Sequence, residues 1–354
     1  MARAVALARK GLYSSDPNPR VGCILVKQGA IIGEGFHLRA GEAHAEINAL
    51  RQAGAQARGA TAYVTLEPCS HHGKTPPCSE ALIAAGIDEL YMAMEDPNPL
   101  VRGRGKKALQ DHGITVHSGL LAAEAEALNP GFVMRMRSGR PFVRCKLAMS
   151  VDGRTAMASG ESQWITGAAA RKDLQQLRAR SSAIITGIGT VLKDDPQLTV
   201  RLQGASRQPL RVILDPRLST PPGAKILQPP GEVLIVTASN EPRVAEPLTA
   251  LGVEVVQLAQ GRDRIDLPAL MALLAEREMN ELHLETGATL SGAFLRAGLI
   301  DELILYIAPK LMGDSARGLF HTPGLEKMAD AVNLNIEDIR AVGSDWRLTI
   351  TIRK

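Results

Sequence analysis

Short apolar runs alternate with amphipathic segments through the first 120 residues, which is the pattern of strands separated by helices. Runs over residues 21–27 and 30–36 predict a strand pair, and runs over 61–66 and 89–94 predict two further strands. Helical patterns cover the N-terminus, begin again near Ala43, and begin once more near Cys78. This half of the chain is therefore expected to be a layered α/β unit with helices on a mixed sheet.

The second half repeats the alternation after a turn signal. Residues 122–137 predict one helix, and the Ser-Gly-Arg-Pro segment at 138–141 marks a junction. A strand follows over 142–149, and further apolar runs cover residues 183–186, 210–214, 233–236, 253–256, 282–285 and 302–308. Continuous apolar runs predict a sheet buried on both faces. We assign residues 1–144 to one domain and 145–354 to the other.

A possible metal centre lies in the first half. His44-Ala45-Glu46 is followed by Pro68-Cys69 and, after eight residues, by Cys78. One histidine and two thiolates are three protein ligands, and catalytic zinc keeps its fourth position for water. In zinc deaminases a glutamate two residues after the histidine moves the protons, so Glu46 is the predicted catalytic residue. The pattern predicts a hydrolytic deaminase.

The local sequence supports these positions. A helix beginning near Ala43 places His44 in its first turn. Residues two apart on a helix point to roughly opposite sides, so His44 and Glu46 can share a site only if it lies over the N-terminal end of the helix. Pro68 ends a strand before Cys69, and Pro77 starts a helix at Cys78. Two features leave alternatives open. Zinc deaminases commonly have two residues between the cysteines, whereas this chain has eight. If His71 or His72 also bound the metal, the site would be a structural zinc site with four protein ligands.

Composition narrows the partners and the compartment. A length of 354 residues with 45% hydrophobic content allows two cores, and a net charge of +4 with 3% aromatic residues suits anionic small molecules better than nucleic acid. The sequence contains no run of eighteen apolar residues, so no membrane-spanning helix is predicted. Four cysteines form no disulfide framework in a chain this long, and Cys23 and Cys145 lie in apolar runs. We expect a reducing, cytoplasmic location and no membrane partner.

The second half carries a weaker chemical signal. Residues 285–292, Glu-Thr-Gly-Ala-Thr-Leu-Ser-Gly, follow a predicted strand and open a helix, so their backbone N–H groups could hold a phosphate. Residues 186–190, Thr-Gly-Ile-Gly-Thr, follow another strand in the same way. Many strand-to-helix loops contain two glycines, so neither segment alone identifies a cofactor site.

Several unusual segments occur together and in order: PNPRVGC, HAEINAL, VTLEPCSHHGKTPPC and EDPNP, then KLAMSVDGRTA, GESQWITG, VLKDDPQLTVR and LETGATLSGAFL. With these segments the chain resembles the bifunctional riboflavin-biosynthesis deaminase/reductase family over nearly its whole length. The resemblance implies a cytidine-deaminase-like α/β/α domain followed by a dihydrofolate-reductase-like α/β domain. It also implies Zn²⁺ and NADPH as cofactors and a phosphorylated pyrimidine as the small-molecule substrate, and we expect a homo-oligomer.

The family's functional positions map onto matching residues of this chain. His44, Cys69 and Cys78 resemble its zinc ligands and Glu46 its proton shuttle. Substrate contacts are implied for Asn18, His37, Lys74, Lys146, Ser162, Arg178, Leu198, Arg201 and Glu285. NADPH contacts are implied for Ala148, Trp164, Thr190, Asp194, Gly287, Ala288, Thr289, Leu290, Ser291, Gly292 and Ala293. Arg178 and Arg201 could bind the ribose 5-phosphate through charge-assisted hydrogen bonds, and the glycine loop could bind the cofactor pyrophosphate.

The resemblance implies two consecutive reactions on one compound. The 2-amino group of 2,5-diamino-6-(5-phosphoribosylamino)pyrimidin-4(3H)-one would be hydrolysed, and NADPH would then reduce the ribosyl group to give 5-amino-6-(5-phosphoribitylamino)uracil. Two alternatives remain at this point. One is a single-activity zinc nucleoside or tRNA deaminase with an accessory substrate-positioning domain. The other is an inactive zinc- and nucleotide-binding module, which the presence of Glu46 disfavours.

Overall fold

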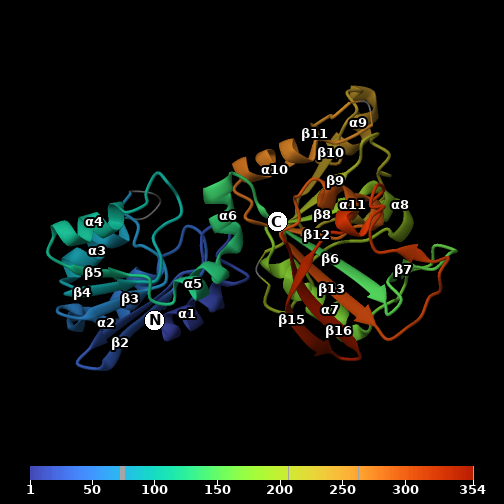
Figure 1. Ribbon diagram of the computed structural model, residues 1–354. Coiled ribbons are helices and arrows are strands. Elements are labelled where there is room, and N and C mark those ends of the chain that lie inside the picture. Colours follow the sequence, from blue (N-terminus) through green and yellow to red (C-terminus); the bar gives the residue numbers. More distant parts are fainter. Residues whose placement is uncertain (72–75, 206, 262, 354) are drawn as a thin grey trace. The chain divides into compact units, whose positions relative to one another are not determined.

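The chain divides into two compact units, Met1–Arg140 and Pro141–Lys354 (Figure 1). The computed structural model describes residues 1–71, 76–205, 207–261 and 263–353. The division lies inside the turn predicted at 138–141. It comes before the expected boundary at 144, which would cut the strand β6 (Phe142–Ser150) in two.

The first unit is built on a five-stranded sheet in the order β2-β1-β3-β4-β5. β1 pairs antiparallel with β2 and β3, whereas β3, β4 and β5 run parallel. The strands are β1 (Gly22–Lys27), β2 (Ala30–Phe36), β3 (Thr61–Val64), β4 (Glu89–Met92) and β5 (Thr115–Ser118). Helices α2 (Ala45–Ala53), α3 (Cys78–Ala85) and α4 (Arg104–Asp111) pack on one face, and α1 (Ala2–Ala8) packs on the other. The three layers confirm the expected α/β/α arrangement.

Close backbone packing places α2 against the sheet. A Cβ at Gly33 or Gly35 of β2 would overlap the carbonyl oxygen of Ala49 or Ala45, respectively. Glycine is required at both positions because only a residue without a side chain lets a helix backbone approach this closely. The start of α2, where His44 and Glu46 lie, is thereby fixed relative to the strands.

The helix predicted over 122–137 is wrong as a single element. The structure has α5 (Ala122–Leu128) and α6 (Pro130–Ser138), with Asn129 between them. Pro130 cannot donate a backbone hydrogen bond and fits only the first turn of a new helix. The buried Asn129 side chain instead accepts a hydrogen bond from the Arg20 N–H at 2.7 Å and donates one to the Arg20 carbonyl at 3.0 Å.

The second unit is built on a nine-stranded sheet in the order β11-β10-β9-β8-β12-β6-β13-β16-β15. Its first seven strands in that order are parallel, and β16 and β15 are antiparallel. Besides β6 the strands are β8 (Ala183–Gly187), β9 (Leu210–Leu214), β10 (Val233–Thr237), β11 (Glu254–Gln257), β12 (Glu281–Leu284), β13 (Glu302–Ala308), β15 (Leu334–Val342) and β16 (Asp345–Ile352). Strands β7 (Arg154–Ala156) and β14 (Arg317–Gly318) form a separate ribbon.

Helices cover both faces of this sheet, as the continuous apolar runs predicted. Helices α10 (Leu267–Glu276) and α11 (Ala288–Arg296) bury one face. Helices α7 (Ala168–Arg180), α8 (Ile188–Asp194) and α9 (Pro242–Thr249) bury the other. Short 3-10 turns occur at Arg9–Gly11, Gly54–Ala57, Lys225–Leu227 and Met328–Asp330. Strands β7, β14, β15 and β16 are additional to the elements that the sequence predicted.

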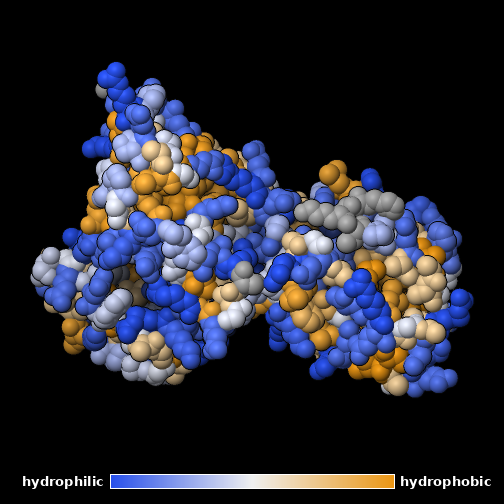
Figure 2. Space-filling view, turned by 180° about the vertical axis from the view of Figure 1, so that it is seen from behind, coloured by the Kyte–Doolittle hydropathy of each residue, from blue (hydrophilic) through white to orange (hydrophobic). Residues whose placement is uncertain are grey.

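The surface drawn in Figure 2 is mainly hydrophilic, with scattered apolar patches on both units. Within the part of the chain that the structure describes, no helix combines the length and the apolar character needed to cross a bilayer. Cys23 and Cys145 are both fully buried in their strands, as their apolar surroundings predicted.

A stability difference should follow from the packing of α11. A Cβ at Gly292 would overlap the backbone carbonyl oxygen of His321, which cannot swing aside as a side chain can. Gly292→Ala is therefore expected to lower the free energy of unfolding by about 1–3 kcal/mol. Gly223→Ala is the matched control, since nothing lies within 4 Å of the added carbon. Urea unfolding of the two variants checks this, and equal stabilities would contradict the close approach.

Candidate functional sites

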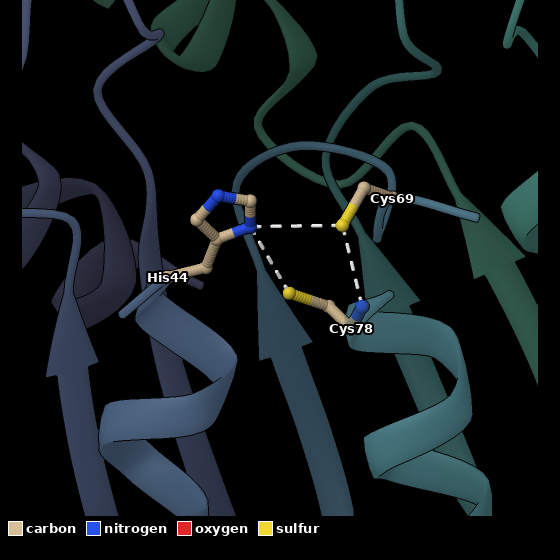
Figure 3. A group of neighbouring side chains, drawn as sticks. All are labelled: His44, Cys69 and Cys78. Carbon is tan, nitrogen blue, oxygen red and sulfur yellow. Dashed lines mark hydrogen bonds between the residues drawn. The ribbon is translucent and has the colours of Figure 1, made fainter. Parts of the chain in front are cut away.

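Three ligand atoms converge in the first unit, from two helix starts and one loop (Figure 3). His44 is the N-cap residue of α2, Cys69 follows β3, and Cys78 is the first residue of α3. The Nδ1 atom of His44 lies 3.2 Å from Sγ of Cys78 and 3.6 Å from Sγ of Cys69. His44 therefore lies just before the helix, one position outside the first turn that the sequence predicted.

The arrangement fits a zinc ion. All three ligand atoms lie within 4.8 Å of one another. Tetrahedral zinc with bonds of about 2.0–2.3 Å holds its ligand atoms on the order of 3.5 Å apart, and one histidine with two thiolates is a donor set that zinc prefers. Among the described residues no fourth ligand joins the group, and His71 is not part of it. His72 lies outside the described residues.

The thiol groups are already polarised towards metal binding. The backbone N–H of Cys78 donates to Sγ of Cys69 at 3.2 Å, at the N-terminus of α3. A hydrogen bond between the two side chains is the main cause that lowers the pKa of Cys69 to about 4 and raises the pKa of Cys78, and the backbone N–H of Cys78 lowers the pKa of Cys69 further. Thiolate is the form of cysteine that binds a metal, so zinc binding at this site would release protons from the two thiol groups.

Glu46 lies in the first turn of α2 and is 3% exposed. Burial, followed by the negative charge of Cys69, raises the pKa of its carboxyl group to about 7. A hydrogen-bonding contact to the Cys78 side chain places it beside the ligand triangle. A carboxyl group poised near neutral pH can both accept and return a proton, which is what a general acid–base residue requires.

Glu67 holds the loop beside the first thiolate, and the sequence reasoning missed it. Its carboxylate accepts hydrogen bonds from the backbone N–H groups of Asp96, Gly103 and Lys106 at 3.0–3.1 Å. A Cβ at Gly105 would overlap the Pro68 carbonyl oxygen, so the segment also packs tightly next to Cys69. The local signal is the Glu-Pro-Cys sequence, because the three donors lie 29, 36 and 39 residues further along the chain.

Asn18 and His37 lie next to the ligand triangle. Asn18 Nδ2 donates to Nε2 of His37 at 3.0 Å, and Nδ1 of His37 lies 3.3 Å from the Ala43 carbonyl oxygen. Burial lowers the pKa of His37, and its ring centroid is 5.2 Å from that of His44. The structure thus brings two of the expected substrate contacts to the metal centre. Lys74 lies outside the described residues.

A second polar cluster lies where strands of the second unit end. Parallel strands present their carboxyl ends at one edge of a sheet, and ligands bind in α/β folds at that edge. Glu285 directly follows β12, and Arg178 of α7 binds its carboxylate with two hydrogen bonds of 2.6 and 2.8 Å. Lys146 lies on the neighbouring strand β6. Burial lowers the pKa of its ammonium group, and the negative charge of Glu285 offsets only part of this effect.

His283 is a further member of this cluster that the sequence reasoning missed. It lies on β12, is fully buried, and has Nε2 3.1 Å from Oε1 of Glu285. Burial alone would raise the pKa of Glu285, but Arg178 and His283 outweigh this and hold it well below its usual range. Glu285 is therefore a fixed anion that can accept hydrogen bonds or stabilise a positive charge.

The two glycine-bearing loops lie side by side at the same edge. Gly187 is the N-cap residue of α8 and Gly287 that of α11, and neither helix start has a side-chain cap. A Cβ at Gly187 would lie 3.1 Å from Leu290, so the loops touch. Thr190 and Asp194 belong to α8, whereas residues 288–293 begin α11. Ser291 and Gly292 are buried, which leaves the exposed Gly287 and Thr289 as the accessible part of the loop.

The remaining predicted contacts are spread around this cluster. Arg201 is exposed, and its Nη1 makes 3.3 Å hydrogen bonds to Gln197 and Thr199. Leu198 is buried, and Ala148 lies opposite Tyr306 in the β6–β13 pair. Trp164 is 63% exposed, with the Arg171 guanidinium 4.7 Å from its ring centre. Ser162, half-buried, lies two residues before it. No direct contact joins Trp164 or Ser162 to Glu285 among the described interactions.

Known proteins match both halves of the chain. Residues 1–94 match the sequence model of the cytidine and deoxycytidylate deaminase zinc-binding region, and residues 141–348 match that of the RibD C-terminal domain. The riboflavin biosynthesis protein RibD of Escherichia coli is 52% identical over 98% of this chain and 96% of its own length.

Solved structures agree with these matches. Acinetobacter baumannii RibD superposes with a TM-score of 0.92 at 48% identity, covering 100% of this chain and 98% of that one. A diaminohydroxyphosphoribosylaminopyrimidine deaminase/5-amino-6-(5-phosphoribosylamino)uracil reductase from Thermotoga maritima gives 0.88 at 34% identity, covering 100% and 97%. The two-domain fold predicted from the sequence is confirmed.

Proposed function

Since the chain belongs to the bifunctional riboflavin-biosynthesis deaminase/reductase family, we propose that its two units act in succession on one phosphorylated pyrimidine. It is a zinc-dependent deaminase and an NADPH-dependent reductase. The match of residues 141–348 to a reductase domain disfavours the alternative of a single deaminase with an accessory domain. The proposed substrate of the first unit is 2,5-diamino-6-(5-phosphoribosylamino)pyrimidin-4(3H)-one, which would lose its 2-amino group as ammonia.

Glu46 is the proposed proton carrier of the first reaction. Zinc held by His44, Cys69 and Cys78 would supply a water acidic enough to attack a ring carbon at neutral pH. The Glu46 carboxylate would take both protons of the attacking water in turn and return one to the ring nitrogen and one to the leaving amino group, so that the ring carbon becomes a carbonyl and ammonia departs. Its buried position in the first turn of α2, beside the ligand triangle, supports both steps. Asn18 and His37 would orient the pyrimidine from the side of His44.

Lys146 and Glu285 are proposed to act on the ribosyl group in the second unit. Bound NADPH would supply a hydride for the ribosyl C1, and the sugar ring oxygen would then need a proton as the C1–O bond breaks. Lys146 is a suitable donor because burial lowers the pKa of its ammonium group. The fixed charge of Glu285 would stabilise the positive charge that develops at the C1–N bond.

Arg178 and Arg201 are proposed to have different tasks. Arg178 makes hydrogen bonds to Glu285 and to the Thr199 carbonyl oxygen, which suits it to orient Glu285. Arg201 is exposed and makes no ion pair among the described residues, so it is the better ligand for the substrate phosphate. Gly287, Thr289 and Thr190 would hold the NADPH pyrophosphate at the paired helix starts.

Arg201→Ala is expected to raise the KM for the phosphoribosyl substrate about tenfold and to leave kcat nearly unchanged. A charge-assisted hydrogen bond to a non-reacting phosphate contributes equally to the ground state and the transition state. Initial rates of NADPH oxidation measure both constants. Arg277→Ala is the control, since Arg277 pairs with Glu254 at the opposite, amino ends of the strands. A fall in kcat at constant KM would place Arg201 in the chemical step instead.

The compartment and the assembly are also proposals. All four cysteines are free, and two of them are the proposed zinc ligands, which supports a reducing compartment and therefore a cytoplasmic enzyme. We propose that the enzyme is a homo-oligomer. Nucleic acid and membranes are not proposed as partners, because aromatic residues make up only 3% of the chain and the net charge is a modest +4.

The ligand triangle of His44, Cys69 and Cys78 is the observation that carries this function most strongly. The test is to supply the purified protein with the diaminopyrimidine, with and without NADPH, and to follow ammonia and NADPH separately. Ammonia is expected in both mixtures, and NADPH oxidation is expected once deaminated product has formed. Release of ammonia with no oxidation of NADPH would leave only the single-activity deaminase.

A further inference from the structure

The ammonium group of Lys146 has an aromatic neighbour on the next strand. Nζ of Lys146 lies over the ring of Tyr306, 5.6 Å from the ring centre. A cation within about 6 Å of the ring centre is attracted by the negative charge of the aromatic face. Among the described residues no hydrogen bond or ion pair holds the Lys146 side chain. The ring is therefore the contact that can fix the place of this ammonium group.

The strand register explains how the ring reaches Lys146. β13 lies between β6 and β16 in the sheet, with Tyr306 opposite Ala148 on one side and Arg347 on the other (Figure 1). Lys146 and Ala148 are two residues apart on β6, so their side chains lie on the same face. Because the side chain of Ala148 is only a methyl group, the large ring beside it can extend to Lys146.

The ring of Tyr306 is held firmly from the side of α7 and β16. Its side chain is fully buried and packs with Leu174 and Leu177 of α7. Its hydroxyl group donates to Oδ2 of Asp173 at 2.5 Å, and Nη1 of Arg347 donates to the same oxygen at 2.9 Å. A phenol that donates to a carboxylate gains electron density in its ring. The contact with Asp173 thus anchors the ring and also makes its face more attractive to a cation.

We propose that Tyr306 is a positioning residue of the reductase reaction, whose ring holds the ammonium group of Lys146 in place and favours its charged form. Asp173 and Arg347 act through Tyr306 as its anchor. This inference rests on the proposed role of Lys146 as the proton donor of the second unit. It adds the group that keeps that proton on a buried amine until the C1–O bond of the sugar breaks.

The electrostatics of Lys146 show why such a group is needed. Burial lowers the pKa of its ammonium group, Glu285 raises it in part, and the positive charge of Arg178 lowers it again. Attraction by an aromatic face stabilises only the charged form of the amine, so it acts in the same direction as Glu285. Loss of this attraction is therefore expected to lower the pH above which Lys146 has no proton to donate.

Other ionisable groups near Lys146 do not account for a change under alkaline conditions. They are Cys145 on β6, Tyr306 on β13, Glu285 and His283 at the end of β12, Arg178 and Asp173 on α7, and Arg347 on β16. Burial raises the pKa of Cys145 to about 12, and burial with the bond to Asp173 raises that of Tyr306. The pKa of Glu285 is held well below its usual range, and burial lowers that of His283. An alkaline fall in reductase turnover is thus assigned to Lys146.

The charge of the ring face can be changed while its shape is nearly kept. Tyr306→Phe keeps an aromatic face, whereas pentafluorophenylalanine at the same position reverses the charge of that face. Reductase turnover of the full chain is measured across pH with NADPH and the already deaminated compound. Tyr306→Phe is expected to keep kcat within about threefold. The fluorinated ring is expected to lower kcat about tenfold and to move the alkaline limb of its pH profile down by about 1 pH unit, with KM nearly unchanged.

Leu305→Ala is the matched structural control. Leu305 precedes Tyr306 on β13, is 5% exposed, and packs in the core on the opposite face of the sheet. This variant is expected to lower the thermal midpoint of unfolding but to leave the alkaline limb in place. Asp173→Asn tests the anchor. It is expected to move the limb down by less than the fluorinated ring does, and to add little in the Tyr306→Phe protein, where the hydroxyl group is missing.

Two results would overturn the proposal. One is the same kcat and the same alkaline limb for the phenylalanine and fluorinated proteins, because a purely structural role depends on shape alone. The other is an equal shift of the limb in Leu305→Ala, which would trace the effect to a disturbed β13.

Lys146→Gln separates this inference from the function on which it rests. Reduction by Lys146→Gln at the wild-type rate would overturn the proposed proton donor, and the role of Tyr306 with it. Loss of reduction in Lys146→Gln, together with no difference between the two rings at position 306, would overturn the role of Tyr306 alone.

Discussion

Glu46→Gln is expected to lower the deaminase turnover number by about 10²–10⁴-fold while the protein keeps its zinc. The amide has nearly the shape of the carboxyl group but cannot take a proton from water and return it to the leaving amine, and proton transfer by a positioned side chain contributes this range. Glu46 is buried in the first turn of α2, beside the ligand triangle. Ammonia release from the diaminopyrimidine measures the loss, and metal analysis measures the zinc.

The second unit of the same chain provides the control for this variant. NADPH oxidation with the already deaminated compound should proceed at the wild-type rate, because its proposed residues belong to other elements. Deamination at more than a tenth of the wild-type rate would remove Glu46 from the proton transfer. If the variant lost its zinc as well as its deaminase activity, Glu46 would have a structural role instead.

Cys69→Ser is expected to remove the zinc and, with it, all deamination. A serine hydroxyl ionises far less readily than a thiol and is a poor ligand for this metal, so the triangle would retain one histidine and one thiolate. The first unit should also lose stability, because bound metal contributes its binding free energy to the folded state. Zinc content and the thermal midpoint of unfolding with and without a chelator check both effects.

Cys23→Ser is the control, since Cys23 is also a cysteine of the first unit but is fully buried within β1, outside the ligand group. It should keep a full complement of zinc and its deaminase activity, at a modest cost in stability from burying a hydroxyl group. A fully metallated Cys69→Ser protein would contradict the ligand assignment.

The metal site could be predicted from the sequence because its chemistry is encoded locally. His44 and Glu46 are two residues apart, and Pro68 and Pro77 mark the strand end and helix start that hold the two thiols. The structure differs by one position only, with His44 capping α2 from outside the helix. Sequence spacing alone left a fourth ligand open, and among the described residues none joins the group.

Residues that act through tertiary contacts could not be predicted in this way. Glu67 holds its loop through three backbone N–H groups, and backbone donors leave no mark in the side-chain sequence. His283 reaches Glu285 because residues two apart on a strand lie on one face. Arg178 is tied to Glu285 across 107 residues of chain, so its pairing needed the fold.

Two of the differences between the predicted and the observed fold have opposite causes. The helical periodicity of apolar residues over 122–137 continues through Pro130. This periodicity does not reveal that Pro130 lacks a backbone N–H donor, which ends α5 and starts α6. In β15, Glu337, Asp338 and Arg340 interrupt the apolar positions, and a bulge between Ile336 and Asp338 breaks the alternation by which an edge strand is recognised.

The most direct test of the two-step account is the ratio of NADPH oxidised to ammonia released from the diaminopyrimidine by the purified wild-type protein. One NADPH per ammonia is predicted, with oxidation lagging behind ammonia release, because the second site acts on the product of the first. Oxidation of NADPH without release of ammonia, or release of ammonia with no subsequent oxidation, would contradict the account.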